Sequence, residues 1–274
     1  MNNLQQRTLT GILFVCTLVG SIAISKWTFF IVFILISYLA TNEFYHLAYK
    51  AKARPNRKIG VATSVYIFIS FFLYASGMVG SKISLGVIPL TVGLFVYELY
   101  RDSKVPFLNL AFTILGLVYV TTPLALFNFF VFPPTESVDP VYSPHLLMGI
   151  FIFIWTNDSG AYLVGSKFGK HKLFERISPK KTWEGSIGGG CLTMIAAVIL
   201  SYSFPQYNLL DMVVVALITV VTGTLGDLVE SMFKRSIQVK DSGSFFPGHG
   251  GLLDRFDSVI LAAPMVYFYF RLIS

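Results

Sequence analysis

Charged side chains are scarce in this 274-residue chain. Asp, Glu, Lys and Arg make up 13% of it and hydrophobic residues 54%, whereas soluble domains carry about 25% charged residues. A membrane-spanning helix needs about 20 apolar residues, or somewhat fewer where its polar ends reach the interface. The sequence therefore excludes an ordinary soluble domain and predicts an all-α, polytopic integral membrane protein with about nine transmembrane helices. Nine runs without any charged residue support this prediction: 8–25, 27–42, 59–81, 83–97, 105–135, 140–157, 185–210, 212–226 and 258–270.

Cysteine is also nearly absent. The two cysteines, Cys16 and Cys191, both fall inside apolar runs. They are expected to pack as small core residues, and the sequence does not support a disulfide framework.

The net charge of +7 raises the question of a nucleic-acid partner. A nine-span arrangement with a cytoplasmic N-terminus places eighteen of the 21 Lys and Arg residues on the cytoplasmic side and leaves Lys26, Lys82 and Arg271 outside. This split obeys the positive-inside rule. The basic excess therefore predicts the orientation of a protein of the plasma or inner membrane, and no nucleic-acid partner is expected.

The polar motifs lie in the second half of the chain. Residues 1–150 contain spans and short loops and predict a scaffold, whereas residues 151–274 are expected to carry the active site. No repeat, low-complexity tract or linker divides them, so residues 1–274 are expected to form a single membrane domain. Four motifs stand out, and the predicted topology brings all of them to the cytoplasmic side: WTNDSGAY (155–162), SPKKTWEG (178–185), GTLGDLVESMFKR (223–235) and KRSIQVKDSGSFFPGHGGLLDRFD (234–257).

Carboxylates in these motifs suit a hard cation. Asp158 and Asp227 fall within or at the ends of apolar helices, where a charge is costly unless it faces a cavity or a partner. Asp254 and Asp257 are three residues apart, so on a helix they share a face. Several hard oxygen ligands without a Cys/His cluster fit Mg²⁺ and do not fit zinc. A plainer alternative stays open, in which Asp254 caps the last helix and Asp257 favours its N-terminal dipole.

Cations and glycines accompany the carboxylates. Lys234, Arg235, Lys240 and Arg255 lie among them, although Lys234 can also form a plain i,i+4 ion pair with Glu230. The PGHGG turn offers backbone N–H groups with little side-chain obstruction, as phosphate-binding turns do. Charge neutralisation and alignment of this kind are what transfer between phosphates requires.

Two of these features have ordinary explanations as well. His249, within the PGHGG turn, can be a hydrogen-bonding loop residue or a base. In SPKKTWEG, a segment expected to be a shaped loop, Lys180 and Lys181 can be topology signals and Trp183 an interfacial anchor.

Residues 231–257 resemble the C-terminal motif of phosphatidate cytidylyltransferases, also called CDP-diacylglycerol synthases, without a departure from the pattern. NDSGAY, SPKKTWEG and LGDLVES resemble further motifs of that family in the expected order. The resemblance implies that CTP and phosphatidate give CDP-diacylglycerol and pyrophosphate at the membrane, with Mg²⁺ and with K⁺ as a candidate second cation. A homodimer stays an open alternative.

The resemblance also implies roles for individual residues. Asp227, Asp254 and Asp257 would hold the metal, and Lys234 and Arg235 would join them in catalysis. The residues expected to bind substrate are Asp158, Ser178, Lys180, Lys181, Trp183, Lys240, Asp241, His249, Gly250, Gly251 and Arg255.

Two other functions fit part of the pattern. A CTP-dependent lipid-alcohol kinase would release CDP, and its alcohol nucleophile would ask more of a base such as His249. An ion or solute transporter also places carboxylates at membrane depth, but transporters often show paired halves with broken helices. Phosphatidate needs no base, because a phosphate monoester with a second pKa of about 6 is largely a dianion at neutral pH. Cytidylyl transfer is therefore the expected function.

Overall fold

The computed structural model describes residues 3–133, 140–243 and 250–273, with side chains from Thr8 onward. Within these ranges, eight helical segments are long and apolar enough to cross a membrane. They are Lys26–Lys50, Arg57–Ala75, Ser81–Tyr100, Pro106–Val131, His145–Phe168, Trp183–Ser203, Leu209–Ser236 and Leu253–Ile273. The first predicted span corresponds to a shorter apolar segment, Thr8–Ile24. The prediction of an all-α, polytopic membrane protein is confirmed.

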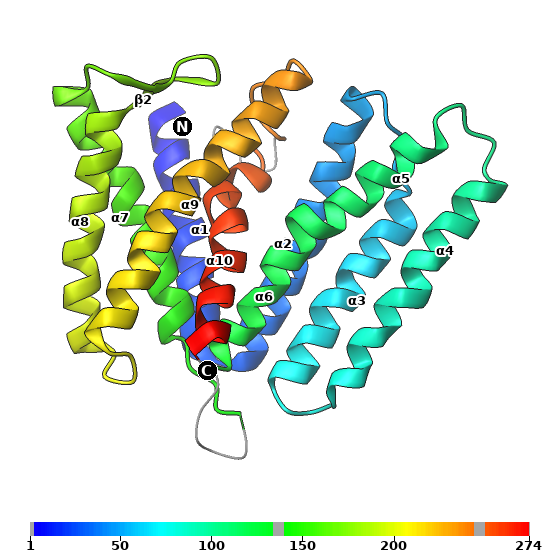
Figure 1. Cartoon of the computed structure of the whole chain (residues 1–274), viewed down its shortest axis with the longest axis horizontal. Coiled ribbons are helices and arrows are strands. Elements are labelled where there is room, and N and C mark those ends of the chain that lie inside the picture. Colours follow the sequence, from blue (N-terminus) through cyan, green and yellow to red (C-terminus); the bar gives the residue numbers. More distant parts are fainter. Residues whose placement is uncertain (1–2, 134–139, 244–249, 274) are drawn as a thin grey trace. The chain divides into compact units, whose positions relative to one another are not determined.

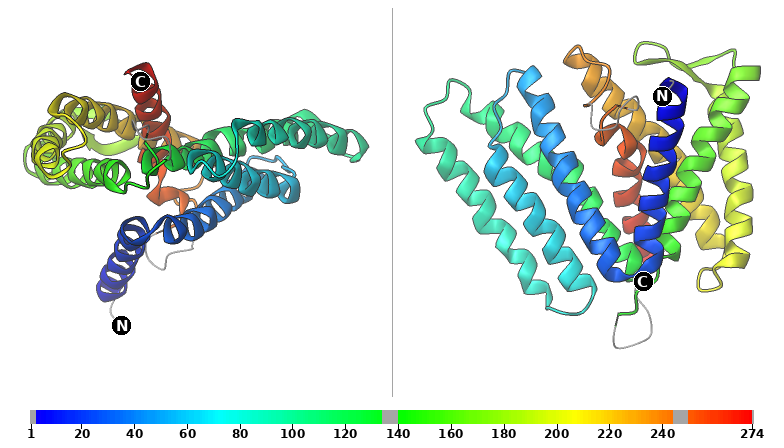
Figure 2. Two further views of the ribbon diagram at one scale, coloured as in Figure 1. Left: turned by 90° about the horizontal axis from the view of Figure 1, so that it is seen from below. Right: turned by 180° about the vertical axis from the view of Figure 1, so that it is seen from behind.

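The chain packs into two compact units, and the first comprises Met1–Ser143 and Asp241–Arg255. A 3₁₀ turn, η1, joins α3 to α4, which run side by side in Figures 1 and 2. A π-helical turn, η2, joins α5 to α6 in one continuous span. The elements of unit 1 are α1 (Asn3–Ile24), α2 (Lys26–Lys50), α3 (Arg57–Ala75), η1 (Ser81–Gly86), α4 (Val87–Tyr100), α5 (Pro106–Leu115), η2 (Gly116–Thr121), α6 (Thr122–Val131) and η3 (Leu253–Arg255).

Buried hydroxyl groups hold α2 in place within unit 1. Thr41 Oγ1 lies 3.1 Å from Ser64 Oγ on α3 and 2.9 Å from Thr121 Oγ1 on η2. One turn along α2, the Tyr45 hydroxyl donates to the carbonyl oxygen of Thr113 at 2.8 Å. Such interhelical hydrogen bonds help membrane helices to associate, because lipid tails are as apolar as the helices themselves. The part of α2 that contains Thr41 and Tyr45 is therefore held firmly by the neighbouring helices of unit 1.

The second unit comprises Pro144–Lys240 and Phe256–Ser274. It contains α7 (His145–Phe168), α8 (Trp183–Ser203), α9 (Leu209–Ser236) and α10 (Asp257–Ile273). Helices α7 and α9 both pack against α8, and α10 packs against α9 (Figure 1). The prediction of a single membrane domain stays a prediction.

A short hairpin connects α7 to α8. Strands β1 (Lys172–Phe174) and β2 (Ser178–Thr182) pair antiparallel, with Lys172 opposite Thr182 and Phe174 opposite Ser178. The segment 178–185 was expected to be a shaped loop. It forms strand β2 and the first turn of α8 instead, because hydrogen bonds at its base, described below, hold it as a hairpin.

Glycines bring α7 and α8 together through their backbones. A Cβ atom built on Gly189 would lie 2.5 Å from the carbonyl oxygen of Asn157, and one on Gly160 would lie 2.9 Å from Gly189 Cα. Small residues allow such close approach between membrane helices. The polar motif on α7 consequently lies directly beside the start of α8.

The two cysteines do not pack in a core. Cys16 on α1 and Cys191 on α8 are both exposed, so the prediction that they are core residues is wrong. The outer face of a membrane helix is itself apolar, because it contacts lipid, and an apolar run therefore does not separate core from lipid-facing positions.

Candidate active site

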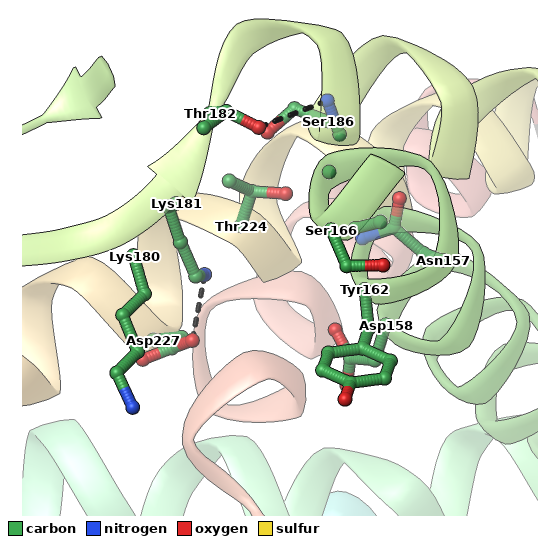
Figure 3. A pocket seen from close by; sticks show the side chains of 13 residues that line it. Asn157, Asp158, Tyr162, Ser166, Lys180, Lys181, Thr182, Ser186, Thr224 and Asp227 are labelled. Carbon is green, nitrogen blue, oxygen red and sulfur yellow. Dashed lines mark hydrogen bonds and ion pairs between the residues drawn. The ribbon is translucent and has the colours of Figure 1, made fainter. Parts of the chain in front are cut away.

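Three of the four polar motifs line one pocket in unit 2 (Figure 3). The pocket has a volume of about 430 Å³ and is lined by α7, β2, α8 and α9. Four predicted site residues, Asp158, Lys180, Lys181 and Asp227, meet here. The other polar side chains of the lining are Asn157, Tyr162, Ser166, Thr182, Ser186 and Thr224.

An ion pair crosses the pocket from the hairpin to α9. Lys181 Nζ lies 2.6 Å from Asp227 Oδ2, and the two side chains are 26% and 30% exposed. Asp158 interacts electrostatically with both of them. Ion pairs that water can reach add little to the stability of the fold. The main effect of this ion pair is therefore to place a positive and a negative charge in the pocket.

Glu184, in the first turn of α8, holds the base of the hairpin. Its carboxylate accepts the backbone N–H of Lys170 at 3.1 Å and that of His171 at 3.2 Å, and it lies 2.5 Å from His171 Nδ1. Thr182 caps the same helix, since its Oγ1 accepts the Gly185 N–H at 3.2 Å. These contacts fix the strand that carries Lys180 and Lys181.

The hydroxyl groups of the pocket and Glu184 are functional candidates that the sequence motifs do not indicate. A helical spacing signal was available, because Tyr162 follows Asp158 by four residues, Ser166 follows Tyr162 by four, and Thr224 precedes Asp227 by three. For Glu184, the signal is an acidic residue in the first helical turn after a Thr N-cap.

A second group of charges lies where α10 packs against α9. A Cβ atom on Gly226 would lie 2.5 Å from the carbonyl oxygen of Asp257, so the two backbones touch there. Asp257 interacts electrostatically with Asp227 and with Lys234. Lys234 Nζ is 3.4 Å from Glu230 Oε2, and both residues are buried. The Glu230–Lys234 ion pair offered by the sequence is therefore present. The metal centre of Asp227, Asp254 and Asp257 stays a prediction.

The described part of the glycine-rich segment belongs to unit 1. Asp254 Oδ2 accepts the backbone N–H groups of Ser242 at 3.0 Å and Gly251 at 2.8 Å. Gly250 has φ +83°, a conformation that glycine adopts without the strain of a Cβ atom. Asp254 therefore closes this turn, and its role as a metal ligand stays a prediction.

The remaining predicted residues keep their status as predictions. Arg235 is exposed and donates from Nη1 to the carbonyl oxygen of Val239 at 3.2 Å. Ser178 and Trp183 lie on β2 and α8 but outside the described lining of the pocket. His249 falls outside the described residues. Three further predicted residues are exposed: Lys240, Asp241 and Arg255.

The Asp227–Asp257 pair is the candidate site for the Mg²⁺ ion that the sequence predicts. The described ranges contain no group of three or more His, Cys, Asp and Glu side chains arranged to hold a metal ion. Mg²⁺ does not depend on such a group, since it is usually bound through one or two carboxylates together with substrate phosphates. Two carboxylates that interact electrostatically supply hard oxygen donors of the kind that Mg²⁺ requires.

Comparison with known proteins supports a family assignment. The model of the cytidylyltransferase family matches residues 5–273. A phosphatidate cytidylyltransferase of Bacillus subtilis is 33% identical over an alignment of 285 positions that covers 100% of both chains. One of Staphylococcus haemolyticus is 33% identical over 95% of this chain and 96% of its own length. One of Haemophilus influenzae is 45% identical over 142 residues, which is 48% of each chain. The chain therefore belongs to the cytidylyltransferase family.

Proposed function

We propose that the protein is a CTP:phosphatidate cytidylyltransferase that makes CDP-diacylglycerol and pyrophosphate for phospholipid synthesis. The observation that carries this proposal is the pocket in which Lys180 and Lys181 meet Asp158 and Asp227 among membrane helices. The relatives named above carry the same activity in their names, two of them matching over nearly the whole chain. The lipid-alcohol kinase and the transporter have no support from these relatives.

The reaction asks mainly for charge neutralisation. An oxygen of the phosphatidate phosphate forms a bond to the α-phosphorus of CTP, and the bond from that phosphorus to the β-phosphate oxygen breaks to release pyrophosphate. Lys180 and Lys181 both line the pocket, and their ammonium groups would neutralise phosphate charge. The nucleophile is already largely a dianion at neutral pH, so no side chain has to remove a proton.

The carboxylates have a different part. Asp227 and Asp257 would hold Mg²⁺, and Asp227 also fixes the position of Lys181 through their ion pair. Bound Mg²⁺ would neutralise charge on the phosphates and stabilise the leaving pyrophosphate. Lys234 forms an ion pair with Glu230 and interacts electrostatically with Asp257, so it would add positive charge near the carboxylate pair.

An assay with purified protein in detergent tests the proposed function. CTP and phosphatidate should give CDP-diacylglycerol and an equal amount of pyrophosphate, and removal of Mg²⁺ should stop both. Diacylglycerol in place of phosphatidate is the control acceptor. Formation of CDP and phosphatidate from diacylglycerol would identify a kinase instead, and a lack of reaction with either lipid would contradict a transferase.

We expect the pocket to face the cytoplasm, since the cation distribution and the location of CTP both require it. In a background with Cys16→Ala and Cys191→Ala, single cysteines replacing the exposed Glu175 on the hairpin and Ser236 on α9 should react with an impermeant thiol reagent only after the membrane is opened. Lys82→Cys, expected on the opposite side, should react in intact cells. Labelling of Glu175→Cys in intact cells would overturn the orientation.

Lys181 should matter more to the reaction than its neighbours on the hairpin. Loss of a charge aimed at a transition state costs roughly a hundredfold in rate, so we expect Lys181→Ala to lower kcat/KM by about that factor and Lys181→Arg to be milder. Lys172→Ala is the matched control, because Lys172 lies on the same hairpin, exposed and outside the described lining. Equal kinetics for the two alanine variants would show that the ion pair with Asp227 has no part in turnover.

A further inference from the structure

One carboxylate in the half predicted to be scaffold holds the glycine-rich segment. Glu43 lies on α2, about 200 residues before that segment in the chain, and it directly follows the charge-free run 27–42. Both belong to unit 1. The sequence motifs gave Glu43 no role, so its contacts with the glycine-rich segment were not predicted.

The Glu43 carboxylate receives hydrogen bonds from two separate parts of the segment. The Ser242 hydroxyl donates to Glu43 Oε1. The backbone N–H of Leu252 donates to Oε2 at 2.9 Å, and that of Leu253 donates to Oε1 at 3.1 Å. Hydrogen bonds to a charged acceptor are roughly twice as strong as those between neutral groups. Residues 242 and 252–253 are therefore tied to the same point on α2.

The packing around this carboxylate leaves no room for side chains. A Cβ atom on Gly251 would lie 2.0 Å from Glu43 Oε1 and 2.1 Å from Ser242 Oγ, and one on Gly243 would lie 2.9 Å from Glu43 Oε2. Two glycines of the segment are thus required by the carboxylate that they contact. This is a second reason for glycine here, besides the phosphate-binding turn that the sequence suggested.

Glu43 and Asp254 accept hydrogen bonds from different backbone N–H groups of the segment. Asp254 accepts the backbone N–H groups of Ser242 and Gly251. Glu43 accepts the backbone N–H groups of Leu252 and Leu253. Ser242 links the two carboxylates, since its hydroxyl donates to Glu43 Oε1 and its backbone N–H donates to Asp254 Oδ2 at 3.0 Å. Because α2 is itself held by buried hydrogen bonds from Thr41 and Tyr45, Glu43 connects the segment to a rigid support.

We propose that Glu43 is a positioning residue for cytidylyl transfer, which fixes the backbone of residues 241–243 and 250–255 so that Asp254 and Arg255 are presented to the phosphates of the substrates. The positioning role rests on the proposed function, whereas the anchoring contact does not. A positioning residue of this kind acts through the backbone that it holds and needs no contact of its own with substrate or metal. In this proposal a residue of the N-terminal half fixes the segment that carries Asp254 and Arg255, so that half has a role beyond that of a scaffold.

Glu43→Gln is the decisive variant, because it keeps the size of the side chain but replaces one acceptor oxygen by an NH₂ donor. Facing three donors, glutamine cannot accept all of them. We expect the backbone amides of Leu252 and Leu253 to exchange with deuterium about tenfold faster or more in the absence of substrates. In the same preparation, kcat for CTP and phosphatidate should fall by about tenfold or more, with a smaller change in KM. Glu43→Asp keeps the charge and should recover part of both.

Glu98→Gln is the matched control. Glu98 is another buried carboxylate of unit 1, but it contacts Arg101 and Asn109. This variant should melt at a lower temperature without faster exchange at Leu252 and Leu253. A general loss of stability would make both variants alike, so faster exchange confined to the Glu43 variants supports the anchor.

The outcomes separate the inference from the proposed function. If deuterium exchange at Leu252 and Leu253 is unchanged in Glu43→Gln, Glu43 does not anchor the segment, whatever the activity of the variant. Faster exchange with unchanged kcat would keep the anchor and overturn the positioning role. Faster exchange in a protein without cytidylyltransferase activity would count against the proposed function and the positioning role together. A double-mutant cycle of Glu43→Gln with Ser242→Ala adds a further test, because residues that act through one contact should have non-additive effects on exchange.

Discussion

Asp227→Asn and Asp257→Asn should each lower kcat by roughly a hundredfold or more, since each removes a charge from the centre where phosphate charge is handled. Asparagine keeps the shape and polarity of the side chain, so the loss reports on charge. The two carboxylates interact electrostatically and are proposed to hold one Mg²⁺ ion. The double variant should therefore cost little more than either single change, because residues that act as a unit are not additive.

Asp211→Asn is the control for this pair. Asp211 lies in the first turn of the same helix, α9, and accepts a hydrogen bond from the Tyr269 hydroxyl at 2.8 Å. It takes no part in the proposed chemistry, so this variant should keep near-normal kinetics. The measurement is initial rate against Mg²⁺ concentration for all four proteins. Normal activity and Mg²⁺ dependence in Asp257→Asn would leave that residue with the role of favouring the N-terminal dipole of α10.

The spans could be predicted because lipid imposes a simple rule on sequence. A charge-free run of sufficient length is readable without knowledge of its neighbours, and eight of the nine predicted spans correspond to helices that meet this requirement. Cys16 and Cys191 show the limit of the rule. Hydropathy does not tell a lipid-facing position from a packed one, and both cysteines are exposed.

The meeting of Asp158, Lys181 and Asp227 in one pocket was also within reach of the sequence, because each motif lies at the predicted cytoplasmic end of a span. The hairpin was not. Strands β1 and β2 have three and five residues, which is too short for an alternating pattern to stand out, and contacts from Glu184 fix their base. Glu43 escaped for a related reason. Nothing in a lone carboxylate after an apolar run indicates which distant backbone amides it will accept.

The glycines on α9 present the same difficulty. Gly223 and Gly226 are three residues apart on one face of the helix, and their sequence context gives no reason to rank one above the other. The structure separates them. A Cβ atom on Gly223 would lie 3.6 Å from Ser258 Cβ, an ordinary contact, whereas one on Gly226 would lie 2.5 Å from the Asp257 carbonyl oxygen and 3.2 Å from Ser258 Cα.

Gly226→Ala should therefore lower kcat far more than Gly223→Ala. The backbone of Asp257 cannot rotate away as a flexible side chain would, so α10 has to move from α9 and carry the Asp257 carboxylate away from Asp227. A displacement of about 1 Å in a catalytic group can cost on the order of a hundredfold in rate. Gly223→Ala should be nearly normal in rate and equal or higher in melting temperature, because alanine favours a helix over glycine by about 1 kcal/mol. Kinetics and thermal unfolding in detergent, measured on both variants, give the comparison. If Gly226→Ala matches Gly223→Ala in kcat, the close approach of α9 and α10 does not set the geometry of the Asp227–Asp257 pair.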